Sequence, residues 1–174
     1  MAKKILVLLA CQIGCFATTA SAAPDLELSL GKPVSELNLD ARVTDARLSW
    51  PSWDVLQNRC QVGPTARVGY MELGADHGWR LGSELLTRCP VTSWLSVGVP
   101  LGVGWVTDYF YADEQNQHHK NLGGPWQFLA GVNVGIQVAD RWALGYELSH
   151  MSNWNNYNKN PTLNTHNLFV RFSF

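Results

Sequence analysis

The chain has 174 residues and a formal net charge of −1, and 16% of its residues are charged. This length is typical of one domain, and the balanced charge leaves no basic field that could attract nucleic acid. After residue 22 no stretch is apolar enough for a transmembrane helix, so membrane proteins of the helical kind are excluded.

The N-terminal residues have the layout of a secretory signal peptide. Lys3 and Lys4 precede the apolar segment Ile5–Phe16, and a run of small residues ends at Ala22. A charged start, a short apolar core and a small-residue cleavage site define such a signal. A lipoprotein site at Cys11 would leave only about half of the usual core of roughly 7–15 residues, so we predict cleavage after Ala22.

Two cysteines remain after removal of the signal peptide. Disulfides persist in exported chains, and we therefore expect a bridge between Cys60 and Cys89. The alternative is two separate buried thiols. A metal site is not expected, because the cysteines show no CxxC spacing.

The mature chain alternates between bulky apolar residues and small or polar residues over about eight segments. Four are irregular (25–31, 41–50, 66–74 and 79–89) and four are clear (95–105, 128–138, 142–153 and 168–174). Successive side chains of a strand point to opposite faces. In the clear segments one face is bulky, and the other is small or polar apart from Leu129, Met151 and Phe169. Charged residues of the irregular segments are expected in the lumen or in loops: Arg42, Arg47, Arg67, Glu72, Arg80 and Glu84.

This pattern favours a membrane barrel over a soluble sandwich. A sandwich turns its bulky faces inward, whereas a narrow membrane barrel turns them toward lipid and fills its lumen with small and polar residues. We predict an all-β fold, an eight-stranded antiparallel transmembrane β-barrel of the outer-membrane type. It would span residues 23–174, after a signal peptide over residues 1–22. A pore is not expected, since the lumen of so small a barrel is only wide enough for side chains.

Tryptophans, connections and the last residue agree with a barrel. The eight tryptophans fall mostly near predicted strand ends, where interfacial girdles place them, although ordinary core positions are an alternative. The tight turn Asp140-Arg141 is expected on the periplasmic side, and the long polar segments 108–125 and 154–165 on the extracellular side. The chain ends on Phe174, and its final strand resembles the last strand of bacterial outer-membrane barrels.

The strongest candidate site lies at the end of segment 142–153. His150 and Ser152 share its apolar face, because side chains two residues apart on a strand point the same way. A histidine activates a serine hydroxyl by taking its proton, provided that the other ring nitrogen is held in the correct tautomer. Asn153 adds a neutral donor for an oxyanion. This spacing is common by chance, but an ionisable side chain on a lipid-facing wall is costly and usually functional.

The run His150–Asn153, the later run Asn160–Asn164 and the alternating final strand together resemble the lipid A 3-O-deacylase family, PagL. The resemblance implies an outer-membrane esterase that removes the 3-position acyl chain from lipid A of lipopolysaccharide. It implies no cofactor and no metal. The expected partners are lipopolysaccharide and other outer-membrane lipids, with a homodimer left open.

The same resemblance assigns a role to each residue of the candidate site. His150 corresponds to the general base, Ser152 to the nucleophile and Asn153 to the oxyanion donor, and the position of the family's acid falls on Asn164. An amide oxygen can fix the tautomer of an imidazole, as in Cys-His-Asn enzymes, but it cannot offset the charge of imidazolium.

A second departure from the family pattern lies after Asn153. The family has a small pair there, one member of which helps to form the oxyanion site, whereas this chain has Trp154-Asn155. Glu147 cannot replace the acid, because it lies on the opposite face of the strand. We expect an active but impaired esterase. The alternatives are a non-catalytic barrel of the same family that binds lipid or supports the envelope, and a small OmpA-like barrel without lipid chemistry.

Overall fold

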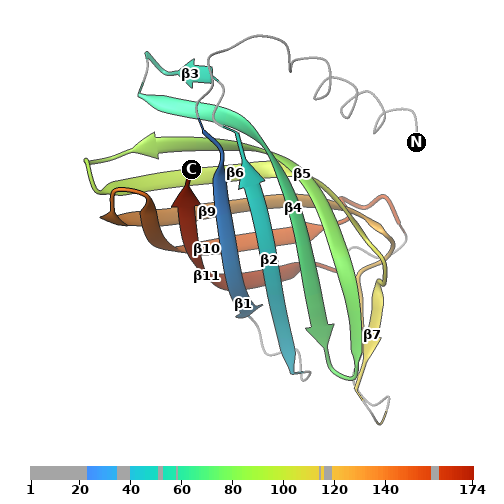
Figure 1. The fold of residues 1–174 in the computed structure, drawn as a ribbon. Helices are drawn as coiled ribbons and strands as arrows, with labels where there is room; N and C mark the ends of the chain where they lie inside the picture. The colour runs from blue at the N-terminus through green and yellow to red at the C-terminus, as the bar shows by residue number, and fades with distance from the viewer. Residues whose placement is uncertain are drawn as a thin grey trace.

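The computed structural model describes residues 23–34, 40–50, 53–57, 59–113, 115, 119–157 and 161–174, so the expected signal peptide lies outside the described residues. No helix in these ranges could cross a membrane. Figure 1 shows strands that curve around a common axis. Eight of them are long: β1 (Asp25–Pro33), β2 (Ala41–Ser49), β4 (Cys60–Leu73), β5 (Asp76–Pro90), β6 (Leu95–Val106), β9 (Trp126–Ala139), β10 (Trp142–Ser152) and β11 (Leu163–Ser173). Three are short: β3 (Trp53–Val55), β7 (Phe110–Ala112) and β8 (His119–Asn121).

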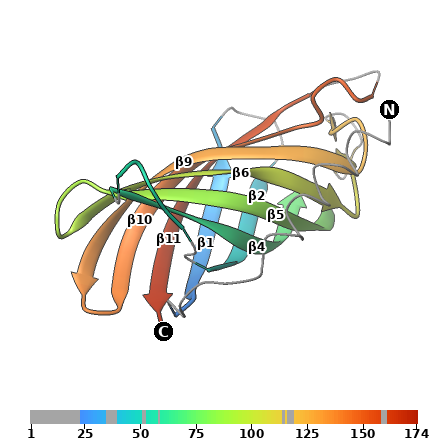
Figure 2. The ribbon, with the colours of Figure 1, turned by 90° about the horizontal axis from the view of Figure 1, so that it is seen from above.

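The eight long strands form a closed antiparallel barrel. They are hydrogen-bonded in the order β2-β1-β11-β10-β9-β6-β5-β4, and the pairing of β2 with β4 closes the ring. The first and last strands lie side by side, with Asp25 opposite Ser173 and Pro33 opposite Thr165. Figure 2 shows the same ring from above. The prediction of an eight-stranded antiparallel barrel is confirmed.

The two ends of the barrel differ in their connections. One end, called the site end below, holds the last residue of β10 and the first residue of β11, and both long segments predicted to share a side connect strands there. The other end, called the terminus end, holds Asp25, Ser173 and the tight turn Asp140-Arg141.

The outer wall of the barrel is apolar, as the alternation predicts. Leu30 and Leu168 are 61% and 69% exposed, while the three inward exceptions Leu129, Met151 and Phe169 are buried. All eight tryptophans are exposed, which agrees with interfacial girdles and not with core positions. Four lie toward the site end (Trp79, Trp105, Trp126 and Trp154) and four toward the terminus end (Trp50, Trp53, Trp94 and Trp142).

Charged side chains fill the middle of the lumen. The guanidinium of Arg47 contacts three carboxylates, at 2.7 Å from Glu27, 3.1 Å from Glu84 and 2.8 Å from Glu147. Arg67 bridges the last two of these at 3.3 and 3.0 Å. Buried charges require such partners and hydrogen bonds, so the lumen is a continuous ion-pair network. Arg80 also faces the lumen, where it pairs with Asp45, whereas Arg42 and Glu72 face outward.

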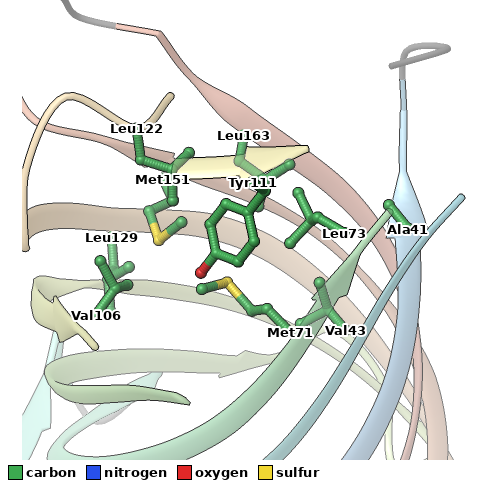
Figure 3. Packing of buried hydrophobic residues seen from close by; sticks show 10 residues of the cluster. All are labelled: Ala41, Val43, Met71, Leu73, Val106, Tyr111, Leu122, Leu129, Met151 and Leu163. Carbon is green, nitrogen blue, oxygen red and sulfur yellow. The ribbon is translucent and has the colours of Figure 1, made fainter. Parts of the chain in front are cut away.

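A small apolar cluster closes the lumen toward the site end. Figure 3 shows Tyr111 between Met71 and Met151, with Leu122 and Leu129 nearby. Tyr111 and Leu122 belong to the segment predicted to be a polar loop, and both are completely buried. The hairpin of β7 and β8 therefore turns part of this segment inward as a plug. Burial raises the pKa of the Tyr111 phenol, whose hydroxyl donates to the carbonyl oxygen of Asp108 at 2.6 Å.

The predicted disulfide is confirmed. Cys60 at the start of β4 is bonded to Cys89 near the end of β5. These residues follow the register of the two strands, in which Gln61 lies opposite Arg88. The bridge therefore ties two neighbouring strands together at the terminus end.

Candidate active site

The candidate histidine is held by the pairing of the last two strands. His150 of β10 lies directly opposite Asn164 of β11 in the antiparallel register, and both side chains are exposed on the outer wall. The distance from His150 Nδ1 to Asn164 Oδ1 is 2.7 Å. Because an amide oxygen only accepts, the contact assigns the proton to Nδ1, which donates to Asn164. Nε2 is then left as an acceptor, the form that a general base requires.

Ser152 lies two residues further along β10, beside this pair. It is only 8% exposed, so the regular alternation of β10 ends here. Ser152 and His150 line the same groove, but the described side chains form no hydrogen bond between Ser152 Oγ and the imidazole. Such bonds are often long in an empty enzyme and shorten when substrate binds.

The structure does not bring Asn153 to this groove. Its side chain is completely buried, and Nδ2 donates to the carbonyl oxygen of Leu122 in the plug at 3.1 Å. The amide thus anchors the end of β10 to the lumen side of the barrel. Its expected role as oxyanion donor would require the side chain to leave this contact.

A tight turn follows Asn153. Trp154 and Asn155 have φ values of 50° and 58°, and the N–H of Asn156 donates to the carbonyl oxygen of Asn153 at 3.0 Å. Two consecutive positive φ values across such a bond define a type I′ turn. Asparagine tolerates this conformation, but for a tryptophan it is strained. The indole packs on Phe128, with ring centroids 5.1 Å apart, and forms one wall of the groove.

The groove itself is the second half of the site. It has a volume of about 750 Å³ and runs across the outer wall from β10 over β9, β6 and β5 to β4. Its lining is mostly apolar, as for Leu85, Leu101, Val103, Phe128 and Ala130. Its size is that of a small-molecule pocket. The groove therefore offers an apolar chain a place beside His150 and Ser152 without leaving the lipid layer.

Sequence reasoning missed the groove and two residues at its edge. Trp154 and Asn156 line it, although the sequence shows them only as members of a polar loop. The signal that was available is the run of residues between Asn153 and Asn164, in which a lone tryptophan interrupts asparagines. The described residues bring together no group of three side chains that could hold a metal ion.

A closed ring of eight strands with an apolar outer wall and tryptophans toward both ends defines an outer-membrane β-barrel protein. The location in the outer membrane follows from this fold. The family model of the lipid A 3-O-deacylases (PagL) matches residues 44–173. The chain belongs to this family. A comparison with curated protein sequences finds no match.

Solved structures show the same fold. The crystal structure of the outer membrane enzyme PagL is 17% identical, with a TM-score of 0.64, covering 86% of this chain and 99% of that chain. The N-terminal β-barrel domain of OprF from Pseudomonas aeruginosa is 11% identical, with a TM-score of 0.60, covering 90% and 100%. A designed transmembrane β-barrel is 13% identical, with a TM-score of 0.55, covering 90% and 98%.

Proposed function

We propose that the protein is an esterase that removes the 3-O-linked acyl chain from lipid A of lipopolysaccharide. The observation that carries the proposal is the His150–Asn164 contact of 2.7 Å on the outer wall, beside Ser152 and a groove open to lipid. Membership of the deacylase family supports this reaction and this substrate. The position of the site within the lipid layer suits an ester whose acyl chain lies in the same layer.

The reaction would use Ser152 as nucleophile and His150 as general base. Ser152 Oγ attacks the ester carbonyl carbon while Nε2 of His150 takes the hydroxyl proton. When the tetrahedral intermediate collapses, the bond to the sugar oxygen breaks and His150 returns the proton to that oxygen. Water then releases the acyl chain from Ser152 by the same steps. Asn164 holds the imidazole in the required tautomer throughout.

The groove would bind the acyl chain that is cleaved. Its walls of leucine, valine and phenylalanine side chains continue from Ser152 across β9 and β6. An acyl chain in this groove contacts apolar side chains along its length and stays out of water. The sugar would then lie above Ser152 at the site end, near Trp154, where the barrel meets the interface.

A non-catalytic barrel that binds lipid is the second candidate. Two observations favour it: the described side chains contain no hydrogen bond between Ser152 and His150, and the acid position is the amide of Asn164. In that case the groove would hold an acyl chain of lipid A without cleaving it.

Mass spectrometry of lipid A separates the two candidates. Purified barrel in detergent is incubated with lipopolysaccharide, and loss of one acyl chain from the 3-position is expected for the wild type and not for Ser152→Ala. Ser83→Ala is the control, because Ser83 is a serine of the outer wall that does not line the groove. Unchanged lipid A with the wild type, under conditions in which another family member cleaves it, would leave only the lipid-binding candidate.

A further inference from the structure

One residue that lines the groove carries an amide nitrogen without a hydrogen-bond partner in the described part of the chain. Asn156 Nδ2 is shielded from solvent and has no hydrogen-bond partner among the described residues. Asn156 lines the same groove as His150 and Ser152. Buried polar groups are hydrogen-bonded in the great majority of cases, so an exception requires an explanation. One explanation is a ligand atom that accepts this N–H only when substrate is bound.

The backbone around Asn156 is fixed on both sides. Its own N–H bonds to the carbonyl oxygen of Asn153 within the type I′ turn. The next residue, Tyr157, accepts a hydrogen bond from the N–H of Trp126 at 3.4 Å, and its ring covers Gly124 so closely that a Cβ there would lie 2.4 Å from it. A donor held in place before reaction is what stabilises a developing negative charge.

Asn153 does not offer the same opportunity. Its amide is completely buried and donates to the carbonyl oxygen of Leu122 on the lumen side. Of Asn153 and Asn156, Asn156 is therefore the one that lines the groove and has an unused N–H.

We propose that Asn156 is the side-chain oxyanion donor of the site, in place of Asn153. The inference rests on the proposed ester cleavage. When Ser152 Oγ bonds to the carbonyl carbon, the π electrons move to the carbonyl oxygen, the hydroxyl proton goes to His150, and Asn156 Nδ2–H donates to the new oxyanion. When the intermediate collapses, the C=O bond forms again and the donor is released.

The test compares Asn156→Ala and Asn156→Asp with the wild type in lipid A deacylation. Aspartate has the shape of asparagine but offers no N–H donor when ionised. Both variants are expected to lower kcat about 100-fold, which is the usual cost of one oxyanion donor, with little change in KM. Gln137→Ala is the control, since Gln137 is an exposed carboxamide of β9 near the terminus end. Retained heat-modifiable mobility in SDS gels shows that each variant is folded.

A second readout does not depend on lipid A. A fluorophosphonate with an alkyl chain reacts covalently with an activated serine through an oxyanion-like transition state, and the adduct on Ser152 is followed by mass spectrometry. Labelling is expected to be slower by about tenfold or more in both Asn156 variants, as for a lost donor. The proposal would be overturned if folded Asn156→Ala kept the wild-type kcat and the wild-type labelling rate while Ser152→Ala lost both. The proposed ester cleavage would still stand in that case.

The two readouts also distinguish this proposal from a failure of the proposed ester cleavage. If the wild type leaves lipid A intact but is labelled at Ser152, slower labelling in the Asn156 variants still supports the oxyanion role, and equal labelling overturns it. If the wild type is neither active nor labelled, both proposals are wrong. A loss of kcat in folded Asn153→Ala, without a loss in Asn156→Ala, would return the role to Asn153.

Discussion

Replacing Asn164 by aspartate should make the site faster. Asn164 Oδ1 accepts from His150 Nδ1–H at 2.7 Å, and Asn164→Asp puts a carboxylate oxygen at the same place. During attack the imidazole becomes positive, and the carboxylate then bonds to a charged partner. Hydrogen bonds between charged groups contribute about 1.5–3 kcal/mol, against about 0.5–1.5 kcal/mol for neutral pairs.

The difference of about 1.4 kcal/mol corresponds to about a tenfold increase in kcat. A Coulomb estimate sets limits on this value: two unit charges about 4 Å apart attract by about 1 kcal/mol in water and about 4 kcal/mol near a protein surface. Both His150 and Asn164 are exposed, so the lower part of this range applies. Asn164→Ala removes the acceptor and should lower kcat about tenfold, the worth of one hydrogen bond.

The assay is the initial rate of acyl-chain release from lipopolysaccharide in detergent micelles, measured over a pH series. The series is needed because a carboxylate also favours the protonated imidazole in the resting enzyme, so plateau rates are compared. Asn121→Asp is the charge control. It adds the same charge toward the site end and keeps the contact in which Asn121 Oδ1 accepts from the N–H of Gly123 at 2.8 Å. Plateau rates equal to wild type in both Asn164→Asp and Asn164→Ala would refute a role for the His150–Asn164 contact.

Three further predictions follow from the groove, the lumen and the disulfide. Ala130→Phe places a ring in the groove. KM for lipopolysaccharide should therefore rise several-fold, while cleavage of p-nitrophenyl acetate, which has no long acyl chain, is unchanged. Equal effects on both substrates would mean that the groove does not bind the acyl chain. Arg47→Met leaves three buried carboxylates without their shared partner and should lower the free energy of unfolding in urea by about 3–5 kcal/mol. Arg42→Met, at an outward-facing residue, should not lower it. Similar urea midpoints for the two variants would contradict the lumen network. Replacing Cys60 and Cys89 by alanine opens a loop of 29 residues and should lower the free energy of unfolding by about 3–4 kcal/mol, which reduction of the wild type should reproduce.

The fold was predictable because lipid imposes one rule on every outward position. Where the outward residues of a strand face hydrocarbon, they are bulky and apolar, and they alternate with small or polar inward residues. This alternation made the strand recognisable in the sequence. The start of β11 was missed for the same reason: its outward side chains Asn164 and His166 are polar, so the alternation weakens where the candidate site lies. Sequence alone therefore located Asn164 by motif and not by periodicity.

The interior was less predictable. Tyr111 and Leu122 are single apolar residues in a polar segment, and such residues are common on protein surfaces, so nothing in the sequence indicated that they turn into the lumen. Arg47 and Arg42 belong to the same strand, and only the register of β2 shows that one is inside and the other outside.

The chemistry at the site was predictable in part. The shared face of His150 and Ser152 could be inferred from the alternation, and the position of Asn164 from the resemblance to the deacylase family, whereas the pairing that puts His150 opposite Asn164 is a finding of the structure. The role of Asn156 could not, since one asparagine among several in a loop carries no distinguishing pattern. Only its Nδ2 atom, which is shielded from solvent and has no partner among the described residues, sets it apart.

The alternation of β10 gives neighbouring residues separate tasks. Glu147 and Met151 hold the interior together, while His150, which lies between these two residues in the sequence, faces the bilayer. A deep mutational scan of this strand should therefore show a period of two. Changes at odd positions would reduce the amount of folded protein, and changes at even positions near the site end would spare abundance and affect turnover. A slip of the strand by one residue would exchange the two sets at once, so the chemistry of this wall is tied to correct assembly of the ring.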